Sequence, residues 1–199
     1  MEHNRGKKIE SSTPLIDAVA SGDLSTAEIE ALIANGASTK ERAIDESTVL
    51  HALVWADGEQ RTEAWTASTL RCLLGAGADL EAVTAWGWTP LMTALMEMNE
   101  ALIHGLLAAG ANPNRRFSKR SFPSFIRGWS LAHLCIVQPD GVRVLKLLTD
   151  RSADLTLKND EGETVQQLCE GTLRDPEEDM DDEFLANIKA CLELLRGLE

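Results

Sequence analysis

The sequence predicts an all-α fold, a solenoid of about five short helix–turn–helix units packed in series. Two observations predict it: apolar residues fall at helical spacing in short paired stretches, and the same pattern returns along most of the 199 residues. The clearest unit covers residues 85–114. Its first helix is expected to begin after Thr89, because Thr is a good N-cap and Pro90 loses a donor that is unpaired anyway.

The second helix of this unit is expected after Asn99, which interrupts the apolar run. Its buried face is predicted to consist of Leu102, Ile103, Leu106 and Leu107. Gly110 then ends the helix, because glycine adopts a left-handed backbone at no steric cost. Two such short helices cannot bury their apolar faces alone, so the unit requires neighbours.

Copies of the same opening and closing signals supply those neighbours. The openings fall at residues 13, 48, 89, 130 and 164, a spacing of about 34 to 41 residues. The shared pattern is GxTPLHxA…LLxxGAD, and 87–91 and 106–112 match it closely. This motif resembles that of the ankyrin repeat family. His51 and His133 match the motif histidine, whereas Ile16, Met92 and Gln167 depart from it.

The resemblance covers roughly residues 13–170 and implies an organisation for the chain. We expect a flexible tail over 1–12 and a single ankyrin-repeat domain over 13–199. The repeats are expected near 13–40, 48–82, 89–114, 130–157 and 164–199, with an inserted basic loop over 115–127 and a C-terminal capping helix over 182–196. In the second repeat, the Asp57-Gly58 turn signal predicts a long loop, with the second helix over 66–75.

The resemblance also implies roles for parts of each repeat. Finger loops and inner helices together form a concave strip that binds proteins. The segment 38–47 is then either such a finger or a solvated turn. The histidines at 51 and 133 are expected to hydrogen-bond the backbone between repeats rather than to act in catalysis, since no Ser or Asp is arranged with them as a triad.

Charge and composition narrow the function further. The formal net charge is −13, which argues against general nucleic-acid or anionic-membrane binding. From Asp140 onward the chain has 16 acidic and 7 basic residues, so most of the negative charge lies there. No apolar run is long enough to span a membrane, and the polar start lacks the apolar core of a signal peptide, so we expect a cytoplasmic protein. The four cysteines lack CxxC spacing and are expected to be reduced core thiols.

Tryptophans are the first candidates for partner contact, because Trp is enriched among binding hot spots. Trp86 and Trp88 flank the finger glycine of the third repeat, although Trp88 is also suited to covering a neighbouring turn. Trp55 is either a groove anchor or a lid packed on Trp65 over the long loop. Trp129, at the start of the fourth repeat, is a further candidate anchor, and Met96 is expected on the exposed side of its helix as a weaker candidate.

The loop 115–127 is the second candidate. It carries Arg115, Arg116, Lys119, Arg120 and Arg127, together with three Phe and no acidic residue. Pro123 argues against a helix through it. Three interpretations stay open: a solvated loop, a loop docked on the acidic C-terminal region, or a contact surface for acidic proteins, phosphates or nucleic acid, of which nucleic acid is the least favoured.

The acidic run 175–183 has seven acids in nine residues but lacks the spacing and central glycine of a calcium loop, so a solvated link is expected. We predict no catalytic residue, no cofactor and no metal. The predicted function is non-enzymatic binding of another protein, by a chain that is monomeric when unbound. The alternative is an acidic inhibitor or immunity-type protein that neutralises a basic toxin or enzyme. An enzyme would need a pocket with perturbed carboxylates around 175–183.

Overall fold

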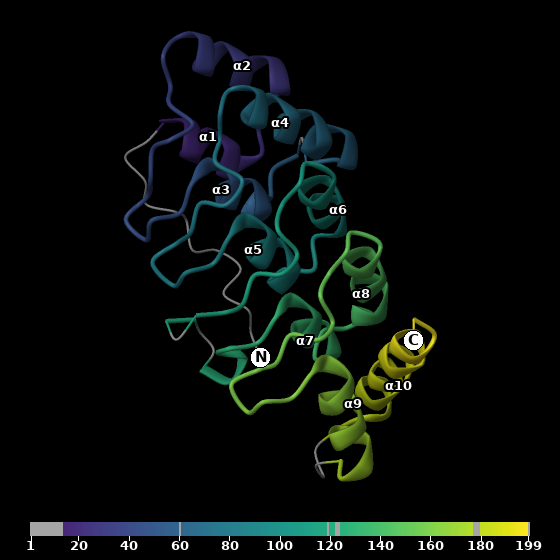
Figure 1. Ribbon diagram of the computed structural model, residues 1–199. Coiled ribbons are helices and arrows are strands. Elements are labelled where there is room, and N and C mark those ends of the chain that lie inside the picture. Colours follow the sequence, from purple (N-terminus) through teal and green to yellow (C-terminus); the bar gives the residue numbers. More distant parts are fainter. Residues whose placement is uncertain (1–13, 60, 119, 122–123, 177–179, 199) are drawn as a thin grey trace. The chain divides into compact units, whose positions relative to one another are not determined.

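The computed structural model describes residues 14–59, 61–118, 120–121, 124–176 and 180–198 (Figure 1). These residues form ten α-helices, one 3-10 turn and no strand beyond isolated bridges, which confirms the all-α prediction. The elements are α1 (Pro14–Ser21), α2 (Thr26–Ala34), α3 (Val49–Trp55), α4 (Glu63–Gly75), α5 (Pro90–Met96), α6 (Glu100–Ala108), η1 (Ser124–Ile126), α7 (Leu131–Ile136), α8 (Gly141–Thr149), α9 (Val165–Arg174) and α10 (Asp182–Arg196). None of the helices in this described part is long and apolar enough to cross a membrane.

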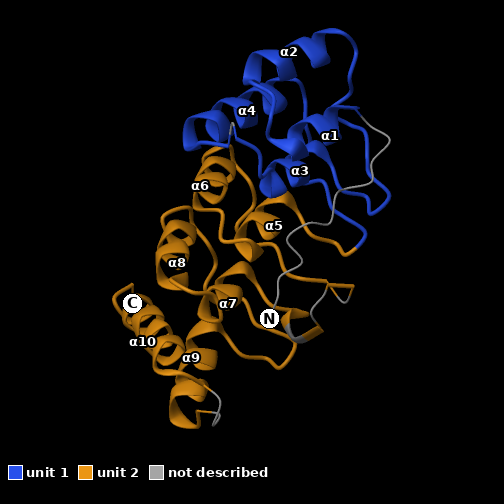
Figure 2. Ribbon diagram, turned by 180° about the vertical axis from the view of Figure 1, so that it is seen from behind, with its two compact units in different colours: residues 1–85 blue, residues 86–199 orange. Residues whose placement is uncertain are grey.

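The chain forms two compact units, divided between Ala85 and Trp86 (Figure 2). In the first unit α1 packs on α3 and α2 packs on α4. In the second unit α5 packs on α6, α7 on both α8 and α9, and α10 on α8 and α9. Inner and outer helices therefore form separate rows in each unit, as in an ankyrin-repeat solenoid. One domain over 13–199 stays a prediction, and the tail 1–12 lies outside the described residues.

Each first helix from the second repeat onward begins in the same way, with a Thr or Ser N-cap and a side chain three residues later that accepts the N-cap N–H. The acceptors differ in chemistry: an imidazole, a thioether, an imidazole and an amide. The pairs are Thr48 with His51 (3.1 Å), Thr89 with Met92 (3.4 Å), Ser130 with His133 (3.3 Å) and Thr164 with Gln167 (3.0 Å). Met92 and Gln167, which depart from the motif, thus fill the same role as the histidines.

The apolar stripes become the core of each unit. The four residues predicted for the third repeat's second helix are all buried. The capping helix α10 has the predicted bounds and buries Ile188, Cys191, Leu192 and Leu195. Asn187 fixes it in place: its Nδ2 donates to the Ile136 carbonyl (2.8 Å), and its Oδ1 accepts the Val142 N–H (3.2 Å). One amide side chain therefore satisfies backbone groups at the turn between α7 and α8.

The boundary predicted for the second repeat was wrong. Helix α4 begins at Glu63 rather than at residue 66, because the Thr62 hydroxyl accepts the Trp65 N–H (3.1 Å) and starts the helix earlier. The connection between α3 and α4 is correspondingly shorter than predicted. Trp65 is buried, and its indole N–H donates to the Leu24 carbonyl (2.7 Å). At the loop's turn a Cβ on Gly58 would overlap the Ser21 carbonyl oxygen, so this close approach requires glycine.

All four cysteines are free thiols on α4, α7, α9 and α10, and three of them are buried. Burial raises the pKa of the Cys169 thiol to about 12 and that of the Cys191 thiol to about 11. Because the thiolate is the reactive form, these side chains behave as small apolar groups of the core.

Candidate functional site

The candidate site is built on two neighbouring finger loops of the second unit, which polar side chains and backbone groups join. Finger A covers residues 115–130 and is closed by a bridge between Arg116 and Ser130; finger B covers 158–164 and is closed by a bridge between Lys158 and Thr164. In finger A the Phe117 N–H donates to the Trp129 carbonyl and the Gly128 N–H donates to the Phe117 carbonyl, both at 2.8 Å. The fingers are therefore built on paired backbone at their bases.

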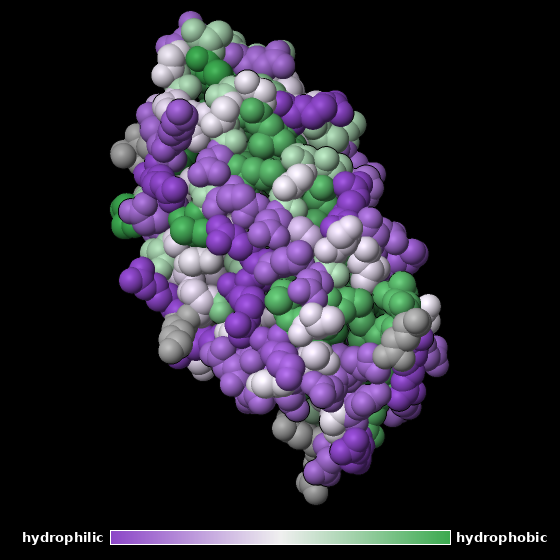
Figure 3. Space-filling view, viewed as in Figure 1, coloured by the Kyte–Doolittle hydropathy of each residue, from purple (hydrophilic) through white to green (hydrophobic). Residues whose placement is uncertain are grey.

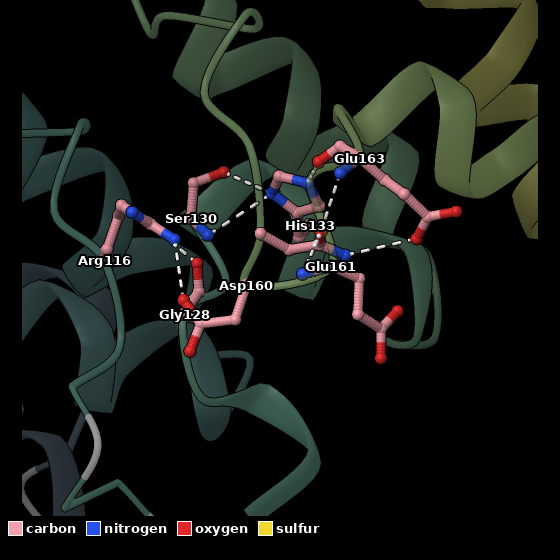
Figure 4. Close-up of polar contacts among 8 residues, drawn as sticks. Arg116, Gly128, Ser130, His133, Asp160, Glu161 and Glu163 are labelled. Carbon is pink, nitrogen blue, oxygen red and sulfur yellow. Dashed lines mark hydrogen bonds and ion pairs between the residues drawn. The ribbon is translucent and has the colours of Figure 1, made fainter.

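Arg116 joins the two fingers (Figure 4). Its Nε donates to the Gly128 carbonyl (2.8 Å), and its Nη2 lies 3.2 Å from Asp160 Oδ1 on finger B. Gly128 has φ +77°, and a Cβ there would overlap the Asp160 carboxylate. The ion pair itself is about half exposed and stabilises the fold little, so its main effect is to fix where the fingers meet.

His133, at the base of this joint, is fully buried. Its Nδ1 accepts the Ser130 N–H (3.3 Å) and contacts the Ser130 hydroxyl (2.7 Å). Because a backbone N–H only donates, Nδ1 must be unprotonated, and the proton sits on Nε2, which donates to the Glu163 carbonyl of the next repeat (3.0 Å). Burial lowers the pKa of His133, an effect that the Glu163 carbonyl partly offsets. The predicted structural role of this histidine between repeats is confirmed.

Two tryptophans form an aromatic cluster with Phe117 of finger A. Trp86 and Trp88 have ring centroids 6.5 Å apart, and Trp88 packs edge-on against Phe117 at 6.1 Å. Phe117 is buried, Trp88 is half-buried and Trp86 keeps 38 % of its surface exposed. The Trp86 carbonyl also accepts from the hydroxyls of Ser118 (3.2 Å) and Ser121 (3.3 Å). Trp86 is thus presented to solvent on a base that the neighbouring finger holds.

The remaining apolar candidates are less exposed. Trp129 is half-buried, with its ring centroid 6.1 Å from that of His133. Met96 was expected on an exposed surface but is half-buried, because it is the last residue of α5 and the chain turns there toward α6. Trp55 ends α3 in the first unit and is half-buried as well.

The basic loop is partly anchored. Phe117, Ser121 and Ile126 are buried, and the described residues of the loop form the 3-10 turn η1 and no α-helix. Arg120 and Arg127 are exposed, and Arg115 is half-buried, whereas Lys119 lies outside the described residues. Arg127 Nε donates to the Ser121 carbonyl (3.2 Å). One of the three interpretations of this loop was docking on the acidic C-terminal region. Arg116 makes such a contact, because it forms an ion pair with Asp160.

An exposed apolar tip in the first unit was not predicted from the sequence. Ile44 is 87 % exposed in the finger 38–47, and Val83 is exposed in the following loop. Arg42 Nη1 joins the two loops by donating to the Val83 carbonyl (2.8 Å) and the Glu46 carbonyl (3.0 Å). In the sequence Ile44 is a single apolar residue among charged ones. Such a residue belongs to no periodic pattern that would predict whether it is buried or exposed.

The surface does not offer one large apolar area on the face shown in Figure 3; hydrophobic groups gather in separate patches with hydrophilic groups between them. A shallow, open depression between α9 and α10 is lined by Glu170, Leu173, Arg174, Leu192 and Arg196. Among the described residues no group of three His, Cys, Asp or Glu side chains is placed to hold a metal ion.

Comparison with known proteins agrees with this architecture. The Ankyrin repeat family matches residues 86–117, which include Trp86, Trp88, α5, α6 and the start of finger A. A mitochondrial disaggregase of Bos taurus is 50 % identical over 42 residues, which are 21 % of this chain and 6 % of that protein. The chain therefore covers far less than two thirds of this relative. The chain therefore contains an ankyrin repeat at residues 86–117, and its repeated helix pairs are consistent with an ankyrin-repeat solenoid.

Proposed function

We propose that this chain is a non-enzymatic module that binds a partner protein through the finger-loop surface around Trp86, either to recruit that partner or to block it. Ankyrin repeats are in general protein–protein interaction modules, and the family's concave strip is expected to contribute here too.

The observation that carries the proposal is the presentation of Trp86. A large indole that is 38 % exposed, yet braced by Trp88 and by two serine hydroxyls on its carbonyl, loses little conformational freedom on binding. Partly exposed aromatic residues on rigid supports are typical of binding hot spots, which a partner's pocket then desolvates completely.

Affinity capture from native extract tests this proposal, with wild type and Trp86→Ala compared side by side. Trp86→Ala should leave the melting temperature nearly unchanged and weaken binding of the captured protein by more than about 1 kcal/mol. Leu198→Ala, which removes another exposed apolar side chain (53 %), is the control and should bind as wild type does. Equal capture by Trp86→Ala would move the binding surface elsewhere.

The net charge of −13 favours a second candidate, an inhibitor of a basic toxin or enzyme that uses the acidic region after Asp140. Electrostatic complementarity of this kind raises the association rate and makes it salt-dependent. A complex whose association rate falls steeply with added salt supports the inhibitor, and salt-insensitive association contradicts it.

A further inference from the structure

The basic loop contrasts in charge with the rest of the chain. Residues 115–127 carry five basic residues and no acid within a protein of net charge −13. In the described part of this loop the cations are used differently. Arg116 is committed to the Gly128 carbonyl and to Asp160, and so it holds the fingers together. Arg120 and Arg127 are exposed, and no acidic side chain pairs with either of them in the described residues.

These two arginines lie close together on the loop. Arg127 Nε donates to the carbonyl of Ser121, the residue directly after Arg120, at 3.2 Å. This bond uses the inner nitrogen of the Arg127 guanidinium and leaves its two terminal nitrogens as donors. Among the described residues Arg120 is bonded through its backbone, whose N–H donates to the Ser118 hydroxyl (3.2 Å), and its side chain is exposed. The Arg127 guanidinium therefore lies next to Ser121, the residue that follows Arg120, and both arginines have guanidinium donors that are not used within the loop.

The backbone beneath them is firmly held. Ser121 is buried, its hydroxyl donates to the Trp86 carbonyl, and its N–H donates to the Ser118 carbonyl (3.0 Å). Phe117 and Ile126 are buried on either side. A ligand that binds Arg120 therefore does not have to order the neighbouring Ser121 first, which lowers the entropic cost of binding.

We propose that Arg120 and Arg127 bind a carboxylate-rich segment of the partner protein; this rests on the proposed protein-binding function. Guanidinium groups match carboxylates in planar, two-pronged hydrogen bonds. Nucleic acid fits less well, because two arginines neutralise few phosphates and binding to a nucleic-acid backbone needs many such contacts. The same loop joins the Trp86 carbonyl, so the acidic segment lies next to the Trp86 contact.

The test uses the full chain, labelled with ¹⁵N, and a capped peptide of alternating Asp and Glu as the probe, at low salt. We expect amide shift changes that centre on the described loop residues, and no binding of the matching Asn/Gln peptide. Arg120→Ala should weaken binding by about fivefold or more, since one charge-assisted contact is lost. The affinity of Arg120→Lys for the peptide should lie between those of wild type and Arg120→Ala, because lysine keeps the charge and lacks the planar guanidinium.

Arg120→Ala is the informative variant because this side chain has no contact that holds the loop, so lost binding reports the ligand contact rather than a collapsed finger. Arg71→Ala, which removes an exposed arginine from α4, is the matched control and should bind as wild type does. The proposal is overturned if the acidic peptide does not bind, if both variants weaken it equally, or if oligothymidylate binds more tightly. Protein capture that persists with wild type but not with Trp86→Ala would then leave the proposed function standing.

Discussion

Acidification should loosen the second unit through His133, whose neutral form the structure requires. The Ser130 N–H points at Nδ1, so a proton there would place two donors face to face. Burial lowers the pKa of His133 below its ordinary value of 6.5. Between that value and the folded pKa, the unfolded chain binds a proton that the folded chain does not. Stability is therefore full above about pH 6.5 and falls as the pH drops below it.

The size of the effect follows from one proton. The free energy of unfolding changes by at most about 1.4 kcal/mol per pH unit for each proton taken up only by the unfolded chain. From pH 7.5 to 5.5 an unfolded histidine becomes largely protonated, so the loss from His133 is at most about 1.4 kcal/mol. Carboxylates with lowered pKa values, such as Glu28, Asp154 and Glu170, also lose stabilisation at lower pH.

His133→Gln separates these contributions. Gln167 shows that an amide at this position accepts the N-cap N–H (3.0 Å), so the helix start is retained while the titrating group is removed. Urea unfolding at pH 7.5 and 5.5 gives the change in the free energy of unfolding with pH for each protein. The contribution of the carboxylates is the same in both proteins and cancels when the two changes are subtracted. Wild type should lose up to about 1.4 kcal/mol more than the variant on acidification. An identical pH dependence of the two proteins would refute the neutral, buried histidine.

Three substitutions test the packing and the turns, each measured by urea unfolding. Leu106→Ala should lower the free energy of unfolding by about 2–5 kcal/mol, because Leu106 is fully buried; a loss below about 1 would contradict that burial. Ser152→Gly should raise it by up to about 1 kcal/mol, since Ser152 has φ +61° where Gly36, Gly77 and Gly110 stand in other repeats; destabilisation would show that its conformation is unstrained. Gly141→Ala should cost about 1–3 kcal/mol because its Cβ would overlap the Cys135 carbonyl, and a neutral effect would mean that the turn yields.

The fold was largely predictable because its signals are local. A Thr N-cap, a Pro at the first helical position and a turn glycine each act through the backbone within a few residues, so α5 and α6 follow from the sequence. The capping helix α10 followed from its apolar spacing in the same way. Helix α4 was predicted to begin too late because the cap at Thr62 competes with the turn signal at Gly58, and periodicity alone does not weigh the two.

The candidate site was predictable in part. Trp86 was singled out by its place beside the finger glycine, a local feature. Which arginines of the loop make contacts within the protein was not predictable. Arg116 is bonded to Asp160, which lies 44 residues further along the chain. The exposure of Ile44 was missed for a similar reason, since it depends on how Arg42 joins two successive loops of the first unit.

The meeting point of Gly128 and Asp160 limits how this chain can be recombined. A Cβ at this glycine would overlap the carboxylate of the following repeat, and Arg116 is bonded to both residues. A chimera that receives finger A but has another residue in place of Asp160 would lose the ion pair that joins the two fingers. A transplant of finger A must therefore include the adjacent repeat that carries finger B.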